Sequence, residues 1–155
     1  MIQNRILLLL ILLLPLTGFC QAYINLSKKQ VKRALEKQVT ANDTINILLT
    51  ETDTSVHYSV RDKKMSEADF ICLFENNKCN AEIVIAGCDS CFTKYLQNAI
   101  NRPKLRWKKL KENLYISAFD KKMMLEIPAN NIPHSFIIRK MKWNKQVYNT
   151  LLSSK

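Results

Sequence analysis

Four closely spaced cysteines are the residues of this chain best suited to chemistry. Cys72, Cys79, Cys88 and Cys91 lie within one stretch of 20 residues. In an exported chain an even number of cysteines favours disulfide bonds, and four cysteines permit three pairings. If residues 76–77 form a hairpin turn, Cys72 and Cys79 lie diagonally on one sheet face and could bond only with some adjustment. A bond from either of them to the 88–91 region is an equal alternative.

The segment Cys88-Asp89-Ser90-Cys91 has the spacing of a thiol–disulfide redox motif. It is expected at the N-terminus of a helix, where the helix dipole stabilises a thiolate. However, no parallel strand–helix–strand pattern surrounds the motif, no Trp precedes it, and Asp89 opposes thiolate formation. The spacing of the four cysteines also permits a zinc site, but only one of its two knuckles is well spaced and export disfavours it. The sequence therefore favours structural disulfides or buried thiols, leaves redox activity as an alternative, and predicts no metal and no cofactor.

The sequence holds no other recognisable catalytic constellation. His57 and His134 are the only histidines, and neither lies in a nucleophile or metal-binding motif. Pairs of carboxylates at alternate positions flank the expected turns. Such a position is typical of solvated surface charges and does not indicate acid–base catalysis. Two glycines are too few for a dinucleotide-binding fingerprint or a phosphate-binding loop. We therefore expect no catalytic residue and predict that the protein is not an enzyme.

The excess positive charge is confined to the second half of the chain. The net charge is +11; residues 87–155 hold 14 basic and 4 acidic side chains, whereas residues 23–86 hold 9 of each. The basic residues concentrate in two runs, 102–111 and 139–145, each of which contains one Trp. Alternate residues of a strand face the same side, so the first run would form a basic stripe backed by Leu105 and Trp107.

This basic stripe is a candidate surface for anions. If the strands that hold the two runs are neighbours, their charges converge, and the surface would bind an envelope polyanion such as a phosphate-bearing lipid or an acidic glycan. The pattern indicates no specific nucleic acid. The alternative is a solvated strand edge, where lysines prevent edge-to-edge aggregation. The candidate anion-binding residues are Arg102, Lys104, Arg106, Lys108, Arg139 and Lys142.

Residues 1–22 predict a secretory signal peptide. A short n-region with one positive charge precedes the apolar run Ile6–Leu16, and small residues close the segment. The run is 11 residues long, whereas a membrane-spanning helix needs about 20. We therefore expect an exported chain, periplasmic or secreted, that does not span the membrane.

The point of cleavage determines the first residue of the mature chain. Cleavage after Ala22 would begin it at Tyr23, and cleavage after Cys20 would begin it at Gln21. Attachment of a lipid to Cys20 is disfavoured, because Phe19 stands where a bacterial lipobox has a small residue.

The mature chain alternates helix-forming and strand-forming segments. The spacing of apolar residues predicts helices over residues 27–38 and 89–101, and residues 144–152 form a short helix or a tail. Between the helices, Asn and Asp replace the missing glycines at the turns. The expected strands are 44–50, 55–60, 68–74, 81–86, 104–109, 114–119, 123–127 and 135–140.

This order, a helix and four strands repeated once, indicates an internal repeat. Ser59–Met65 matches Ser117–Met123 at five of seven positions, and both segments fall at the second turn of their unit. The expected fold class is α+β, with an antiparallel sheet and helices on one face. The expected divisions of the chain are a signal peptide (1–22), a first helix-plus-four-strand unit (23–87), a second such unit (88–143) and a C-terminal helix or tail (144–155).

The opening of the first helix, Leu26-Ser27-Lys28-Lys29-Gln30-Val31 followed by Leu35, resembles that of small exported helix-plus-four-strand modules. Examples are the β-lactamase-inhibitor-protein-like fold and the small lipoprotein of the outer-membrane assembly machine. The resemblance covers only this stretch, and the Gly-x-Pro that usually follows the helix in those modules is missing here. It implies a periplasmic protein-binding module and carries over no functional residue.

Together these observations predict an exported, non-enzymatic binding or interaction module of the cell envelope, whose partner is an unidentified protein or a polyanion. One alternative is a small thiol–disulfide redox protein that uses Cys88 and Cys91. The other is an envelope polyanion-binding protein that uses the basic second half. A redox protein would expose the sulfur of Cys88, and a polyanion-binding protein would gather the two basic runs on one surface.

Overall fold

A computed structural model describes residues 23–41, 45–62, 67–129 and 133–153. The expected signal peptide and the Cys20 lipid-attachment site lie outside the described residues, as does part of the expected turn that follows Arg61. No helix in these ranges is long and apolar enough to cross a membrane.

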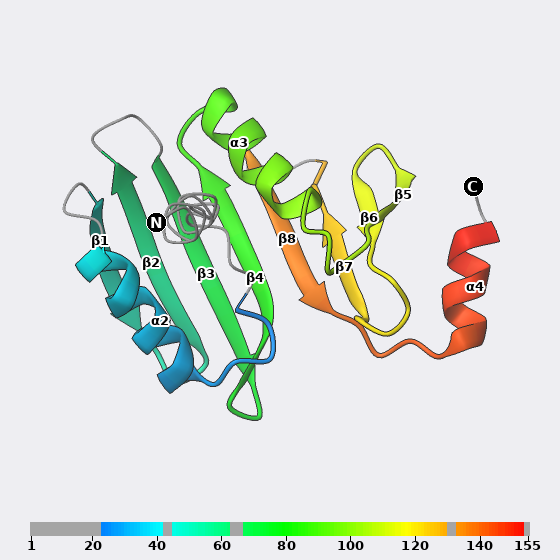
Figure 1. The fold of residues 1–155 in the computed structure, drawn as a ribbon, viewed down its shortest axis with the longest axis horizontal. Helices are drawn as coiled ribbons and strands as arrows, with labels where there is room; N and C mark the ends of the chain where they lie inside the picture. The colour runs from blue at the N-terminus through cyan, green and yellow to red at the C-terminus, as the bar shows by residue number, and fades with distance from the viewer. Residues whose placement is uncertain (1–22, 42–44, 63–66, 130–132, 154–155) are drawn as a thin grey trace, which may run out of the picture.

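Helices and strands follow one another in the predicted order, and the last segment of the chain is a helix (Figure 1). In chain order, the elements are α2 (Lys28–Ala41), β1 (Ile45–Glu51), β2 (Ser55–Asp62), β3 (Glu67–Glu75), β4 (Lys78–Ala86), α3 (Asp89–Ile100), β5 (Lys108–Lys111), β6 (Leu114–Ile116), β7 (Met123–Glu126), β8 (Ser135–Lys140) and α4 (Lys145–Ser153).

All eight strands form one antiparallel sheet, which confirms the α+β fold class. The strand order is β1-β2-β3-β4-β8-β7-β6-β5, so two four-stranded meanders join through their last strands. The segments Ser59–Met65 and Ser117–Met123 both lead from the second to the third strand of their meander. Asn76 and Asn77 form the β3–β4 turn with positive φ angles of 50° and 58°, as expected of Asn in place of glycine.

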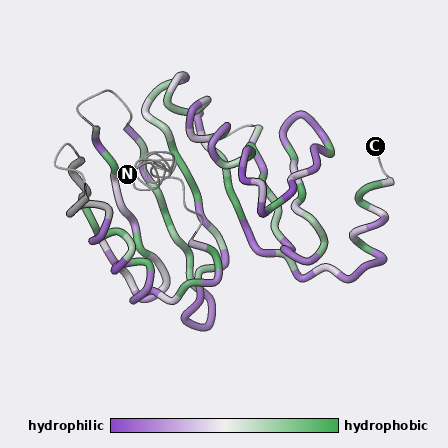
Figure 2. The backbone as a smooth tube through the Cα atoms, in the orientation of Figure 1, coloured by the Kyte–Doolittle hydropathy of each residue, from purple (hydrophilic) through white to green (hydrophobic). Residues whose placement is uncertain are grey.

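The main hydrophobic core lies between one face of the sheet and the helices α2 and α3 (Figure 1). Alternate residues of the central strands point into it, and helix residues such as Val31 and Leu35 pack against them. Phe70 is fully buried; its ring stacks on Tyr58 at 4.7 Å and meets Tyr95 of α3 edge-on at 5.4 Å. Figure 2 shows the hydrophobic colouring of β4 and the hydrophilic turn that links it to β3.

The last helix, α4, packs against the opposite face of the sheet. Ile116 of β6 is buried in a second cluster with Trp143 and Tyr148, and Met124 of β7 borders that cluster. Neighbouring residues of the same strands belong to the main core, so this second cluster lies on the other side of the sheet. The prediction that the helices cover one face therefore holds for α2 and α3 but not for α4.

The fifth strand is shorter than predicted, beginning at Lys108 rather than Lys104. The chain turns through residues 101–105, and Arg106 adopts a positive φ of 49°, which no regular strand accommodates. The Trp107 indole packs against the main core and donates a hydrogen bond of 2.9 Å to the carbonyl of Ala99 in α3. Because Trp107 is bound to α3, the chain before Lys108 does not continue the strand that was expected from Lys104.

Candidate functional site

The face of the sheet that points away from α2 and α3 is apolar in its middle, and among the described helices only α4 covers part of it, at the β6–β7 end. On this outer face, Ile71, Ile83 and Ile137 lie directly opposite one another on three neighbouring strands, β3, β4 and β8. Each is partly exposed, whereas the residue beside it, such as Phe70 or Val84, is buried in the core. The three side chains form a continuous aliphatic row across the middle of the sheet.

Further aliphatic side chains extend this row along the strands. Leu73 is 37% exposed. Among the described residues, neither buried cluster includes the side chains of this row and its extensions. The members of this surface, which we call the aliphatic face, are Ile71, Leu73, Ile83, Ile85 and Ile137.

Charged and polar side chains border the aliphatic face on two sides. On β2 and β3, the Ser59 hydroxyl donates a hydrogen bond to Asp69, and His57 Nε2 lies 3.8 Å from the same carboxylate. At the other side, Arg139 forms an ion pair with Glu126. An apolar centre inside a polar rim is the usual composition of a protein–protein interface.

The Cys88–Cys91 pair forms a disulfide bond at the N-terminus of α3, with the two Cα atoms 5.1 Å apart. Cys88 is the N-cap residue, and its sulfur accepts a hydrogen bond of 3.1 Å from the backbone N–H of Cys91. Cys88 is half-buried and Cys91 is buried. This arrangement closes a short loop and caps the helix.

The surroundings of this disulfide include a charged pair. His134 Nε2 lies 2.7 Å from a carboxylate oxygen of Asp89, whose side chain is otherwise solvated. The ring of His134, a residue with a positive φ of 57°, lies near the ring of Phe92 on α3. When His134 is protonated, its charge offsets that of Asp89 beside the helix N-terminus.

The other two cysteines, Cys72 of β3 and Cys79 of β4, are buried free thiols. Cys72 lies opposite Glu82, and Cys79 lies opposite Phe74, because Asn80 forms a bulge in β4. The hydrogen bond that the Cys72 thiol shares with the Cys79 sulfur, followed by burial, raises the pKa of the Cys72 thiol, so the two sulfurs are neighbours. The four cysteines thus form two separate pairs, and the residues that the structure describes contain no group of three or more His, Cys, Asp or Glu side chains placed to hold a metal ion.

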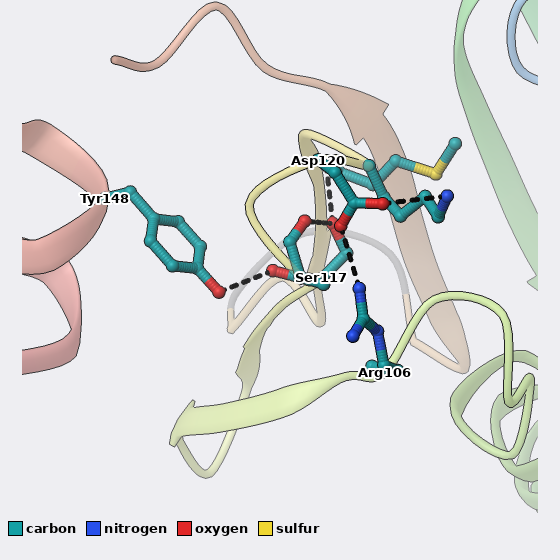
Figure 3. A network of polar contacts seen from close by, with 7 residues as sticks. Arg106, Ser117, Asp120 and Tyr148 are labelled. Carbon is teal, nitrogen blue, oxygen red and sulfur yellow. Dashed lines mark hydrogen bonds and ion pairs between the residues drawn. The ribbon is translucent and has the colours of Figure 1, made fainter. Parts of the chain in front are cut away.

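The strands that hold the two basic runs are not neighbours. β5 is the edge strand and β8 is central, with β7 and β6 between them. Arg106 donates a hydrogen bond of 3.0 Å to Asp120, and Lys121 contacts the other oxygen of that carboxylate at 2.9 Å (Figure 3). Lys142 Nζ lies 3.7 Å from Glu75. Lys104 and Lys108 are exposed on the β5 side of the sheet.

The same region shows how α4 is attached to the sheet. The Tyr148 hydroxyl donates a hydrogen bond of 3.0 Å to the carbonyl of Ser117, and the Ser117 hydroxyl accepts one of 2.9 Å from the backbone N–H of Met123 (Figure 3). Asp120 and Lys121 lie in the turn between Ser117 and Met123, and Arg106 reaches Asp120 from the segment before β5. Arg106 therefore helps to fix the β6–β7 turn as well as contributing charge.

A buried carboxyl group in the main core was not expected from the sequence. Glu82 of β4 is only 2% exposed, and its Oε1 accepts a hydrogen bond of 3.3 Å from the Tyr58 hydroxyl. Burial raises the pKa of Glu82 to about 7, against the opposing effects of the Arg102 charge and of hydrogen bonds from Tyr58 and from the Tyr23 backbone. The available signal was an acidic residue inside the otherwise apolar run Ala81–Ala86.

Comparison with known protein families, with characterised proteins and with solved structures finds no match.

Proposed function

We propose that this protein is an exported, non-enzymatic binding module of the cell envelope that holds a protein partner on its aliphatic face. The observation that carries the proposal is the row formed by Ile71, Ile83 and Ile137, which lies on the sheet face away from α2 and α3. Exposed apolar side chains that adjoin one another inside a polar rim are typical of interaction sites. The polar rim suits a partner with a matching aliphatic centre.

Export is the second element of the proposal. It is supported by the tripartite pattern of residues 1–22 and by the Cys88–Cys91 disulfide, a bond that persists in oxidising compartments. The tandem order of the two meanders and the sequence match between Ser59–Met65 and Ser117–Met123 support an origin by repetition of one unit.

The test compares two lysine substitutions in the tagged protein, expressed in its native host. Ile83→Lys places a charge in the centre of the aliphatic face, whereas Thr93→Lys places one on an exposed position of α3. We expect the envelope protein captured by the wild type to be captured equally by Thr93→Lys and to be lost with Ile83→Lys, while far-UV circular dichroism shows both variants folded. Retention of the same partner by Ile83→Lys would contradict the proposal.

A second candidate function is thiol–disulfide exchange at Cys88 and Cys91. The helix N-terminus favours it, because the N–H that Cys91 directs at the Cys88 sulfur would stabilise a Cys88 thiolate after reduction. Insulin reduction by the wild type, lost in a Cys88→Ser/Cys91→Ser double variant, would support this function in place of a structural disulfide.

A further inference from the structure

The buried Glu82 carboxyl group can accept more hydrogen bonds than the surrounding groups donate. Its Oε1 is hydrogen-bonded to Tyr58, but its Oε2 has no hydrogen-bond partner among the described residues. An ionised carboxylate at such a buried position is costly unless it is paired and hydrogen-bonded. The site therefore suits an additional donor, and a positively charged one best.

The nearest chain segment to this carboxyl group is the start of the described structure. Tyr23 is 1% exposed, its ring meets that of Tyr58 at 6.0 Å, and its backbone N–H forms a hydrogen bond to the Glu82 carboxyl group. The residues that follow are fixed to β4: Asn25 donates to the Cys79 carbonyl at 2.8 Å, and Cys79 donates to the Leu26 carbonyl at 2.9 Å. The backbone nitrogen of Tyr23 is therefore held at Glu82.

We propose that the signal peptide is removed after Ala22 and that the new α-ammonium group of Tyr23 forms a buried ion pair with Glu82. This rests on the proposed export. A signal peptidase would hydrolyse the Ala22–Tyr23 peptide bond, leaving a carboxylate on Ala22 and a protonated amine on Tyr23. The peptide nitrogen of the precursor has one N–H, whereas the ammonium group has three and a positive charge. The ammonium group can therefore donate more than one hydrogen bond to the Glu82 carboxyl group and compensate its negative charge. Cleavage thus supplies the donor that Glu82 lacks in the precursor.

The ion pair changes how stability depends on pH. In the uncleaved chain Glu82 binds a proton more tightly when folded than when unfolded, so the folded state loses stability as the pH rises toward 7. In the cleaved chain the ammonium group favours the ionised carboxylate, and this loss disappears. The other titratable or charged groups at Glu82 are Tyr58 of β2, Cys72 of β3, Cys79 of β4 and Arg102 after α3.

The experiment compares two purified chains that differ by one residue, each released from a fusion that leaves no extra residue. One begins at Tyr23 and the other at Ala22. At pH 7.5 we expect the folding equilibrium constant of the Tyr23 chain to be at least tenfold larger, as measured by urea unfolding. The same comparison in a Glu82→Gln background should show no difference. Equal stability of the two chains with Glu82 present would overturn the proposal.

N-terminal sequencing of the protein from its native host separates this inference from the proposed export. A mature chain that begins at Tyr23 supports both. A chain that begins at Gln21, or at a lipid-modified Cys20, leaves export standing and overturns the ion pair. A chain that retains Met1 overturns both.

Discussion

Substitution of two adjacent residues of β3 distinguishes the covered face of the sheet from the open one. Phe70 is fully buried between Tyr58 and Tyr95, so Phe70→Ala removes a large core side chain and two aromatic contacts. A buried Phe→Ala change costs about 3–5 kcal/mol, which includes the cavity that remains. Ile71 points to the aliphatic face, and Ile71→Thr keeps a β-branched residue in the strand. We expect Ile71→Thr to cost less than about 1 kcal/mol.

Urea unfolding of the purified mature chain at pH 7, followed by circular dichroism, measures both changes in the free energy of unfolding. The wild type is expected to have a stability of about 5–15 kcal/mol, so Phe70→Ala leaves little or no folded protein in a chain of low stability. In that case Phe70→Leu provides a milder core variant. A cost for Ile71→Thr as large as that for Phe70→Ala would show that the outer face is packed, and would refute the argument for an open aliphatic face.

Three further predictions follow from single interactions. Replacing both Cys88 and Cys91 by Ala should lower the free energy of unfolding by about 2 kcal/mol, a modest effect because the disulfide closes a short loop. Calorimetry measures this loss, with the reduced wild type as control, and an unchanged free energy of unfolding would contradict the prediction. Tyr148→Phe removes the hydroxyl group that donates to the Ser117 carbonyl and should lower the free energy of unfolding, measured with urea, by about 1 kcal/mol. Val147→Ala, at an exposed position of the same helix, should lower it less. The reverse order would contradict the attachment of α4 through Tyr148. In a chain that begins at Ala22, the raised pKa of Glu82 should lower the free energy of unfolding by about 3 kcal/mol between pH 4.5 and pH 8, beyond any change seen in Glu82→Gln. The loss develops between pH 4.5 and about 7, because the Glu82 carboxyl group releases its proton in the unfolded state at a lower pH than in the folded state. Unfolding curves measured over this pH range test it, and an equal dependence on pH in the two proteins would contradict it.

Local patterns along the sequence predicted most of the elements of this fold. Alternation placed Phe70 and Cys72 in a strand, helical spacing placed Tyr95 in α3, and Asn at positions 76–77 marked a hairpin turn. These features depend on neighbouring residues alone, so the sequence contains enough information to predict them. The even number of cysteines favoured structural disulfides or buried thiols but left their pairing open, and the structure pairs Cys88 with Cys91.

The relations between distant segments were harder to predict. The two basic runs were expected to converge if their strands were neighbours, but β8 pairs with β4 and leaves β5 at the sheet edge. The strand around Arg106 was shortened by the hydrogen bond from Trp107 to α3, a tertiary contact that β-propensity does not include. Glu82 was missed because alternation indicates which face a residue occupies. It does not indicate that hydrogen bonds from two other segments and the charge of Arg102 help to accommodate a carboxyl group there.

Site-specific photo-crosslinking in the native envelope shows whether the aliphatic face is the binding surface. A photoreactive residue replaces Ile83 at the centre of the face in one strain and Thr93 on the exposed side of α3 in another. If the aliphatic face holds the partner, the photoreactive residue at position 83 forms one defined protein adduct, and the one at position 93 forms no adduct of the same mass. Absence of an adduct at position 83, or the same adduct from both positions, would contradict it.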